Sequence, residues 1–167
     1  MLTKNFSSLV TATSLGVSTH PVFTDRDGNT SSIYDAYQYF ASSKVIGILQ
    51  NKTLSQLESE RGVGVSAFGF GSGTSKPSST DITITLIDDT DIVVNTISQA
   101  TANTQIVVLG NYSYNGTNPI TISEIGYFTK INDSANTKTA LFAREVLPTP
   151  ITVTNGETFT VYMVIGS

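Results

Sequence analysis

Few residues of this chain have side chains suited to nucleophilic or metal-dependent catalysis. The only histidine, His20, lies in a Ser-Thr-His-Pro segment with no carboxylate close by in the sequence. A catalytic triad or a multi-histidine metal site would have to be built on this one imidazole. The absence of cysteine excludes thiolate nucleophiles, thiolate metal ligands and disulfide bonds. We therefore expect no enzyme activity, no metal site and no cofactor.

Two pairs of glutamates are the remaining candidates for acid–base chemistry. Glu58 with Glu60, or Glu124 with Glu145, could in principle flank a glycosidic bond. Nothing in their spacing requires that arrangement. We expect Glu124, close to Gly126, to accept backbone hydrogen bonds at a distorted point of a strand instead.

Three aspartates lie close together in a segment that could bind a hard cation. Carboxylate oxygens of Asp88, Asp89 and Asp91 would suit calcium if a loop folded them inward. The spacing does not match a helix-loop-helix calcium loop, because position 93 is Val and no Glu follows at the twelfth place. A solvated turn between strands is the favoured interpretation.

The glycine-rich segment Gly69-Phe-Gly-Phe-Gly-Ser-Gly73 has the composition of a phosphate-binding loop. It meets neither the GxGxxG nor the GxxxxGK[ST] spacing, no helix-forming segment follows, and Lys76 precedes a proline. A flexible loop is the better interpretation of Gly71–Ser79.

The low charge of the chain indicates protein partners rather than nucleic acid. Charged residues make up 13% of the 167 residues, about half the usual share, and Ser, Thr, Asn and Gly supply the polarity. The net charge is −4 and no Lys/Arg cluster occurs, so binding to phosphate backbones is not expected. A surface with so few charges suits a subunit that buries its exterior against neighbours. The alternative is a Thr-rich β surface that is simply tolerated.

The sequence shows no sign of membrane insertion or secretion. No segment approaches the roughly 18 uninterrupted apolar residues of a membrane span. The first residues carry one lysine and a Ser/Thr-interrupted run, which makes a poor secretion signal. The lack of cysteine fits assembly in a reducing cytoplasm.

The second half of the chain has the alternating pattern of β-strands. Ile120–Ile131 and Thr139–Leu147, joined by a polar loop, predict a hairpin. Ile151–Thr154 and Glu157–Ile165 flank Asn155-Gly156 and predict a second hairpin, with Pro148 and Pro150 marking an edge or a crossover between sheets. Further strands are expected at Val63–Phe70, Asp81–Leu86, Ile92–Ile97 and Gln105–Tyr114. We predict an all-β fold: a two-sheet antiparallel β-sandwich, jelly-roll or immunoglobulin-like, over residues 61–167.

The alternation changes phase within Ile120–Ile131. Ile122 and Tyr127 can face the same core only if the strand gains a residue near Ser123–Gly126, so we predict a β-bulge there. Phe128 is then left on the outer face. We take it as a candidate contact for a neighbouring subunit; solvent exposure or cover by the amino-terminal region is the alternative.

Residues 1–60 show less alternation and a more mixed polar and aromatic composition than the rest of the chain. We expect them to form a mixed, partly helical amino-terminal region. Asp25–Asn29 reads as a turn, and Ser32–Ala41 as a short helix. This region carries more aromatic surface than one short helix buries alone, so it would either pack on the sandwich or serve as a docking arm. The candidate interface residues are Phe6, Tyr34, Tyr37, Tyr39 and Phe40.

Three groups of segments carry a family resemblance. They are the opening Met1–Phe6, the Gly-Thr-rich loop Phe70–Asp81 leading into a strand, and Ile122-Ser-Glu-Ile-Gly-Tyr-Phe128 followed by Leu141–Pro148 and Gly156–Val161. Together they resemble small structural proteins of tailed bacteriophages, such as fibre, collar and head-decoration proteins. The resemblance covers residues 62–167. It implies a β-sandwich virion component, assembled in the host cytoplasm, that associates with copies of itself and docks onto capsid or tail proteins.

The expected function is therefore non-enzymatic: a subunit that decorates a capsid or forms the base of a fibre. The alternative is a carbohydrate- or receptor-binding module of a tail fibre or tail adaptor, with Tyr112, Tyr114 and Tyr127 as candidate sugar contacts. Fold class alone does not separate the two.

Overall fold

A computed structural model describes residues 1–14, 22–32, 62–87, 92–93, 96–99, 106–132 and 137–165. The tyrosines at 34, 37 and 39, Phe40, the helix predicted at Ser32–Ala41 and the aspartates at 88, 89 and 91 lie outside this described part, apart from Ser32. The elements are α1 (Lys4–Ser14), β1 (Val22–Thr24), β2 (Thr30–Ser32), β3 (Gly62–Gly71), β4 (Ile92–Val93), β5 (Thr96–Gln99), β6 (Ile106–Ser113), β7 (Ile120–Asn132), β8 (Thr137–Val153) and β9 (Thr158–Ile165).

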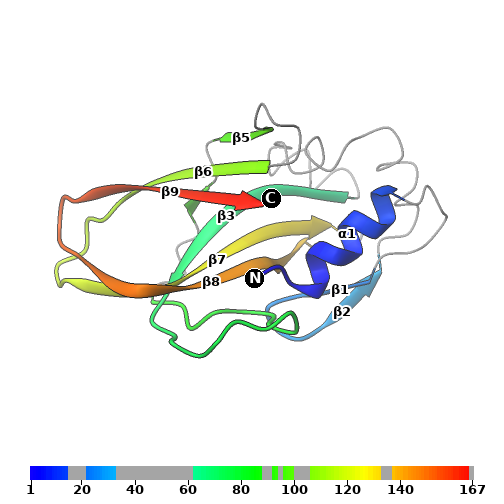
Figure 1. The fold of residues 1–167 in the computed structure, drawn as a ribbon, viewed down its shortest axis with the longest axis horizontal. Helices are drawn as coiled ribbons and strands as arrows, with labels where there is room; N and C mark the ends of the chain where they lie inside the picture. The colour runs from blue at the N-terminus through cyan, green and yellow to red at the C-terminus, as the bar shows by residue number, and fades with distance from the viewer. Residues whose placement is uncertain are drawn as a thin grey trace.

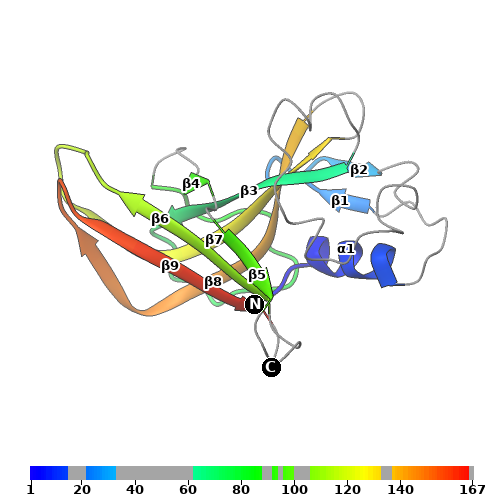
Figure 2. The same cartoon turned by 90° about the horizontal axis from the view of Figure 1, so that it is seen from above.

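The fold is all-β, with antiparallel pairing throughout the described strands. One sheet has the order β4-β3-β7-β8, a second the order β5-β6-β9, and β1 pairs with β2. Figures 1 and 2 show β6 and β9 lying over one face of the four-stranded sheet, while the stretch from β3 to Ile87 crosses the opposite face. Both faces of the four-stranded sheet are therefore covered.

The hairpin predicted in the second half is confirmed and forms the middle of the molecule. β7 pairs with β8 from Asn132↔Thr137 to Ile120↔Val153. β8 runs on past the predicted end at Leu147 and includes both Pro148 and Pro150. As expected for a strand with two missing donors, β8 lies at an edge of its sheet.

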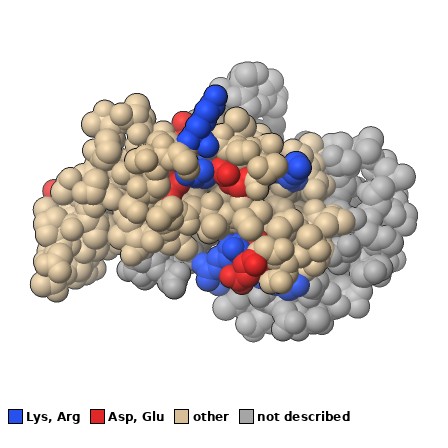
Figure 3. Space-filling model, turned by 90° about the horizontal axis from the view of Figure 1, so that it is seen from below, with Lys and Arg blue, Asp and Glu red and all other residues tan. Residues whose placement is uncertain are grey.

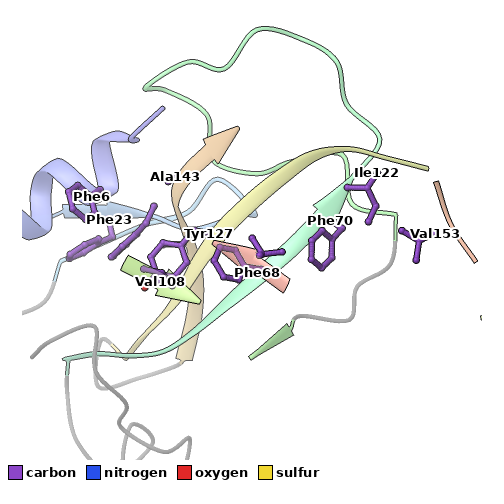
Figure 4. Packing of buried hydrophobic residues seen from close by; sticks show 12 residues of the cluster. Phe6, Phe23, Phe68, Phe70, Val108, Ile122, Tyr127, Ala143 and Val153 are labelled. Carbon is purple, nitrogen blue, oxygen red and sulfur yellow. The ribbon is translucent and has the colours of Figure 1, made fainter. Parts of the chain in front are cut away.

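The main hydrophobic core lies between the two larger sheets and is rich in aromatic rings. Phe68 and Tyr127 from the four-stranded sheet join Val108 and Val161 from the three-stranded sheet in one cluster (Figure 4). Phe142 of β8 makes an edge-on contact with Tyr127 of β7 and extends the core toward the amino-terminal region. Alternation accounts for Val108 and Val161 in this core, whereas the register shifts between β7 and β8 bring Ile122 and Tyr127, which differ in phase, into the same core.

A β-bulge occurs where it was predicted within Ile120–Ile131, but the extra residues are on the neighbouring strand β8 and not on β7. The β7–β8 register shifts between Ile122 and Glu124, which pair with Ile151 and Val146. Leu147 to Pro150 are thus accommodated on β8 against Ser123 alone on β7. Ile122 and Tyr127 share one core, as the change of phase required.

The prediction that Phe128 lies on an exposed outer face was wrong. Phe128 is 1% exposed and packs with Ile84 and Leu141 in a second, smaller core. Its ring lies against Gly69 and Gly126, where an added Cβ would come within 2.8 Å of it. The outer face is buried because the segment after β3 folds back across it, which strand periodicity could not reveal.

The strand predicted at Asp81–Leu86 is absent. This segment is extended and makes one isolated bridge, Gly71↔Leu86, with no continuous ladder. Its alternation is nevertheless real: Ile84 is buried and Leu86 packs beside it in the second core. A short extended cover over a sheet face shows the same period of two as a strand within the sheet.

The last predicted hairpin is correct at its turn and wrong in its pairing. Gly156 has φ +85°, and Glu157 N donates to Thr154 O at 3.1 Å, which closes the turn. The two flanking strands, however, belong to different sheets: β8 pairs with β7, and β9 pairs with β6. The turn therefore carries the chain from one sheet to the other. A crossover between sheets was one of the two arrangements expected from Pro148 and Pro150.

The described amino-terminal residues are joined to the middle of strand β8, at Leu141–Arg144. Helix α1, which periodicity did not predict, places Phe6 against Phe142 with ring centroids 6.2 Å apart. Asn5 bonds to Thr24 through both its side-chain atoms and also donates to Leu141 O. The turn predicted at Asp25–Asn29 is confirmed and links β1 to β2, with Gly28 at φ +86°.

Candidate functional site

The acidic residue that seemed most open to a chemical role, Glu124, is fully buried in an ion pair. Arg144 on β8 donates through Nε to Oε2 of Glu124 at 2.7 Å. The other carboxylate oxygen, Oε1, accepts the backbone N–H groups of Gly73 at 2.9 Å and Thr85 at 2.6 Å. Glu124 thus accepts backbone hydrogen bonds, as predicted, but they come from the covering segment Ser72–Ile87 rather than from its own strand.

Arg144 extends the same network to a second carboxylate. Its Nη1 donates to Oδ2 of Asp81 at 2.8 Å, and its Nη2 donates to the backbone oxygen and hydroxyl of Ser75. Burial alone would raise the pKa of Asp81, but the Ser78 N–H, the Arg144 hydrogen bond and its positive charge together hold that pKa below the ordinary value. Burial opposes the charge of Arg144, yet its two carboxylate partners raise its pKa.

The glycine-rich segment does hold an anion, but the anion is the chain's own carboxylate. A Cβ on Gly71 would lie 2.6 Å from the Glu124 side chain, and one on Gly73 would overlap its carboxylate. The segment interpreted as a flexible loop begins as the end of β3 and then binds Glu124. Glycine is required here so that the backbone N–H can approach the carboxylate closely.

In this polar network both carboxylate oxygens of Glu124 and the guanidinium of Arg144 are engaged by groups of the same chain. Glu145, the suggested partner of Glu124, is exposed and follows Arg144 on β8, so it points to the opposite face of the sheet. Among the residues that the structure describes, no three His, Asp or Glu side chains are grouped so as to hold a metal ion. Glu124 and Glu145, one of the two pairs considered, therefore lie on opposite faces of the sheet, and Glu58 and Glu60 lie outside the described residues.

A mostly apolar groove is the stronger candidate for a functional surface. It has a volume of about 430 Å³ and lies between the edges of the two larger sheets. Its lining comes from the first two residues, β7, β8 and β9: Met1, Leu2, Ile125, Ala143, Arg144, Glu145, Leu147, Val161, Tyr162, Met163 and Val164. We call it the β8–β9 groove. Such a volume is in the range of ligand pockets, and the apolar lining is typical of a binding surface.

Exposed apolar side chains are concentrated at this groove. Tyr162 is 66% and Val164 is 53% exposed, and Met1 and Leu2 on the facing side are exposed as well. Isolated exposed apolar residues need no explanation, but four around one groove make it a candidate contact surface. Tyrosine is also among the residues enriched where proteins bind one another.

On the face shown in Figure 3, the charged side chains of the described residues leave one end of the molecule almost free of charge. In Figure 3, charged side chains gather over the middle of the face shown, and the end formed by the turns that join β6 to β7 and β8 to β9 is almost entirely uncharged. Strand β9 itself, Thr158–Ile165, contains no charged residue. Little electrostatic repulsion would therefore oppose contact with another protein there.

The predicted interface residues fall into two groups. Phe6 and Phe128 are buried against their own chain, with 6% and 1% of their surface exposed. The aromatic residues of 33–40 lie outside the described part. Of the tyrosines suggested for sugar binding, Tyr127 is fully buried, and the rings of Tyr112 and Tyr114 pack against each other with centroids 6.3 Å apart.

Sequence reasoning missed the groove, although part of its signal was visible. In β9 the residues Phe159, Val161 and Met163 alternate with Thr158, Thr160 and Tyr162, so the outward position of Tyr162 followed from the pattern. The opposing wall could not be found in this way, because Leu2 and Leu147 approach β9 only through the packing of the two sheets.

Comparison with known proteins adds no further assignment. No protein-family model, curated protein or solved structure matches this chain. Within the described residues, no helix has both the length and the apolar character needed to cross a membrane.

Proposed function

We propose that this protein is a non-enzymatic structural subunit of a tailed-bacteriophage virion, which assembles through protein–protein contacts. In this role it decorates the capsid or forms the base of a fibre or adaptor, with other virion proteins and copies of itself as partners. It is assembled in the host cytoplasm and ends up in the virion. The virion assignment rests on the segments that resemble phage structural proteins.

The observation that carries the assembly role is the β8–β9 groove with its uncharged strand. Tyr162 and Val164 expose more than half of their surface beside a groove of about 430 Å³. A soluble protein seldom keeps such an apolar surface in water without a partner. The low overall charge of 13% points in the same direction.

The fold that accompanies this role is a two-sheet β-sandwich. Its support is the single cluster that joins Phe68 and Tyr127 with Val108 and Val161 from the other sheet. In this proposal residues 61–167 form the assembly block, and the described amino-terminal residues pack against it, with Phe6 in its core.

Two measurements test the proposed function. Light scattering coupled to size-exclusion chromatography, over a hundred-fold range of concentration, should show association of the purified chain. Imaging of assembled phage particles that carry this chain with a label should place it on the head or the tail. A monomer at every concentration, together with unlabelled particles, would contradict the proposal.

A carbohydrate-binding role is the second candidate, favoured by the exposure of Tyr162 at the groove. Aromatic rings with one open face are suited to stacking contacts with ligands. A glycan array separates the two roles: binding that is lost in Tyr162→Ala supports the sugar site. An array without any bound glycan removes that candidate.

A further inference from the structure

The free edge of β9 is the feature of the fold that most needs a partner. β9 pairs with β6 over its whole length, from Ser113↔Thr158 to Ile106↔Ile165. Within the described part of the chain, no strand pairs with its other edge. An unpaired edge presents N–H and C=O groups to any strand that approaches it.

The peptide groups that face this open edge can be assigned. Tyr114 N donates to Glu157 O at 2.9 Å, in line with the β6–β9 register, so odd-numbered residues of β9 bond to β6. Thr160, Tyr162 and Val164 therefore direct their peptide groups outward. The same three residues are exposed, so the edge offers hydrogen-bonding groups and side chains together.

The two long edge strands, β8 and β9, differ in how their edges are protected from pairing with another strand. The β8 edge contains Pro148 and Pro150, and its middle is covered by Met1–Thr3 through the Leu2↔Ala143 bridge and the bond from Thr3 N to Phe142 O. β9 has no proline, no charge and no register shift. Proteins normally protect an edge strand with one of these devices. The lack of all of them indicates that the β9 edge is meant to be paired.

We propose that β9 pairs antiparallel with β9 of a second copy of this chain, about a two-fold axis near Tyr162. The inference rests on the proposed assembly role and names its surface and its partner. Across such an axis Tyr162 lies opposite its own copy, and Thr160 lies opposite Val164 of the partner copy. Each strand also enters the β8–β9 groove of the other copy.

A second copy fits this site because the edge matches itself in charge, length and pattern. β9 is eight residues long and uncharged, so pairing with its copy brings no like charges together. The side chains of the added strand that face the groove meet Leu2 and Leu147, which are apolar. A two-fold contact of this kind closes on itself and gives a dimer rather than a fibre.

Lysine substitution with a matched control tests the pairing. Val164→Lys places a charge at the open edge, whereas Val22→Lys makes the same change at a valine of equal exposure on β1 (53% and 50%). Because the added lysine would lie on the paired edge, opposite Thr160 of the partner copy, and a lysine on an edge strand opposes pairing with a further strand, we expect the dimer dissociation constant to rise roughly ten-fold or more for Val164→Lys. Val22→Lys should leave it unchanged. Thermal unfolding of both variants checks that the fold is retained.

Cross-linking gives a second readout that does not depend on affinity. The chain has no cysteine, so Tyr162→Cys creates a single thiol. Under mild oxidation it should form a disulfide-linked dimer, and Val22→Cys should not. Cross-linking at Tyr162 with loss of dimer in Val164→Lys supports the proposal.

Three other outcomes overturn it, and each leaves a different conclusion. If oligomers persist in Val164→Lys and Tyr162→Cys does not cross-link, β9 pairing fails while the proposed assembly role stands. If the chain is monomeric and Tyr162→Cys cross-links only to another protein in assembled particles, the edge binds a foreign strand. If it is monomeric and absent from particles, the proposed function fails as well.

Discussion

Arg144 and Glu124 lie on neighbouring strands and form a buried ion pair, with Nε of Arg144 2.7 Å from Oε2 of Glu124. The pair joins the four-stranded sheet to the segment Ser72–Ile87, because Glu124 also accepts two N–H groups from that segment and Arg144 also binds Asp81. The second hydrophobic core around Phe128 lies beneath the same segment. Stability of this face should therefore depend on a few polar contacts.

Glu124→Gln should destabilise the protein by about 3 kcal/mol, because it leaves the buried guanidinium of Arg144 with one carboxylate partner fewer. Urea denaturation followed by circular dichroism measures the loss. Glu145→Gln is the control, since Glu145 is exposed on the next position along β8, and it should change the free energy of unfolding by less than about 0.5 kcal/mol. Equal losses in the two variants would show that the ion pair contributes little.

Gly73→Ala should destabilise the fold by about 1–3 kcal/mol, because the added methyl group occupies the space of the Glu124 carboxylate. The exposed neighbour Ser72 provides the control, and Ser72→Ala should be close to neutral. Urea denaturation of both variants decides the matter. A Gly73→Ala variant as stable as the parent would mean that the segment shifts away from Glu124 without cost.

Asp81 should make stability depend on pH in the acid range. Its pKa in the folded protein is below the ordinary 3.8, so its contribution is present above that pH and is lost as the pH falls through the lower, folded value. Asp81→Asn lacks this carboxyl group. The difference in free energy of unfolding between parent and variant should therefore shrink as the pH is lowered below 3.8, measured by urea denaturation at several pH values. A difference that stays constant would contradict the assigned role of Arg144.

Phe128→Ala should cost about 3–5 kcal/mol, because the ring fills a core between the sheet and its covering segment. Tyr162→Ala removes a side chain that is 66% exposed and should cost far less in the isolated chain. Thermal or urea unfolding at a protein concentration low enough for the monomer gives both values. A larger loss of stability for Tyr162→Ala than for Phe128→Ala would contradict the burial of Phe128.

The placement of individual strands shows how far local pattern reaches. The strands predicted at Val63–Phe70 and Gln105–Tyr114 are confirmed as β3 and β6, because alternation and β-branched residues act over neighbouring positions. The alternation at Asp81–Leu86 correctly predicted that alternate side chains are buried, but the prediction that this segment forms a strand of a sheet was wrong. Burial of every second residue is a local property, whereas pairing requires a free edge on another strand, and β3 pairs with this segment only through the isolated bridge Gly71↔Leu86.

The candidate site shows the same division. The outward position of Tyr162 follows from the alternation of β9, but its neighbours across the groove, Leu2 and Leu147, come from distant parts of the chain. Helix α1 was missed, and with it the burial of Phe6, whose neighbour Phe142 lies far along the chain.

The amino-acid sequence by itself determined the antiparallel β character, the turn at Asn155-Gly156 and the low charge, since these depend on residue types and on neighbours along the chain. Only the tertiary structure decided that Phe128 is buried, that Glu124 binds Arg144, and that β9 lies beside a groove with no second neighbour among the described strands. Each of these depends on which segment covers which face of a sheet. That choice is made by contacts between residues far apart in the sequence, which periodicity does not encode.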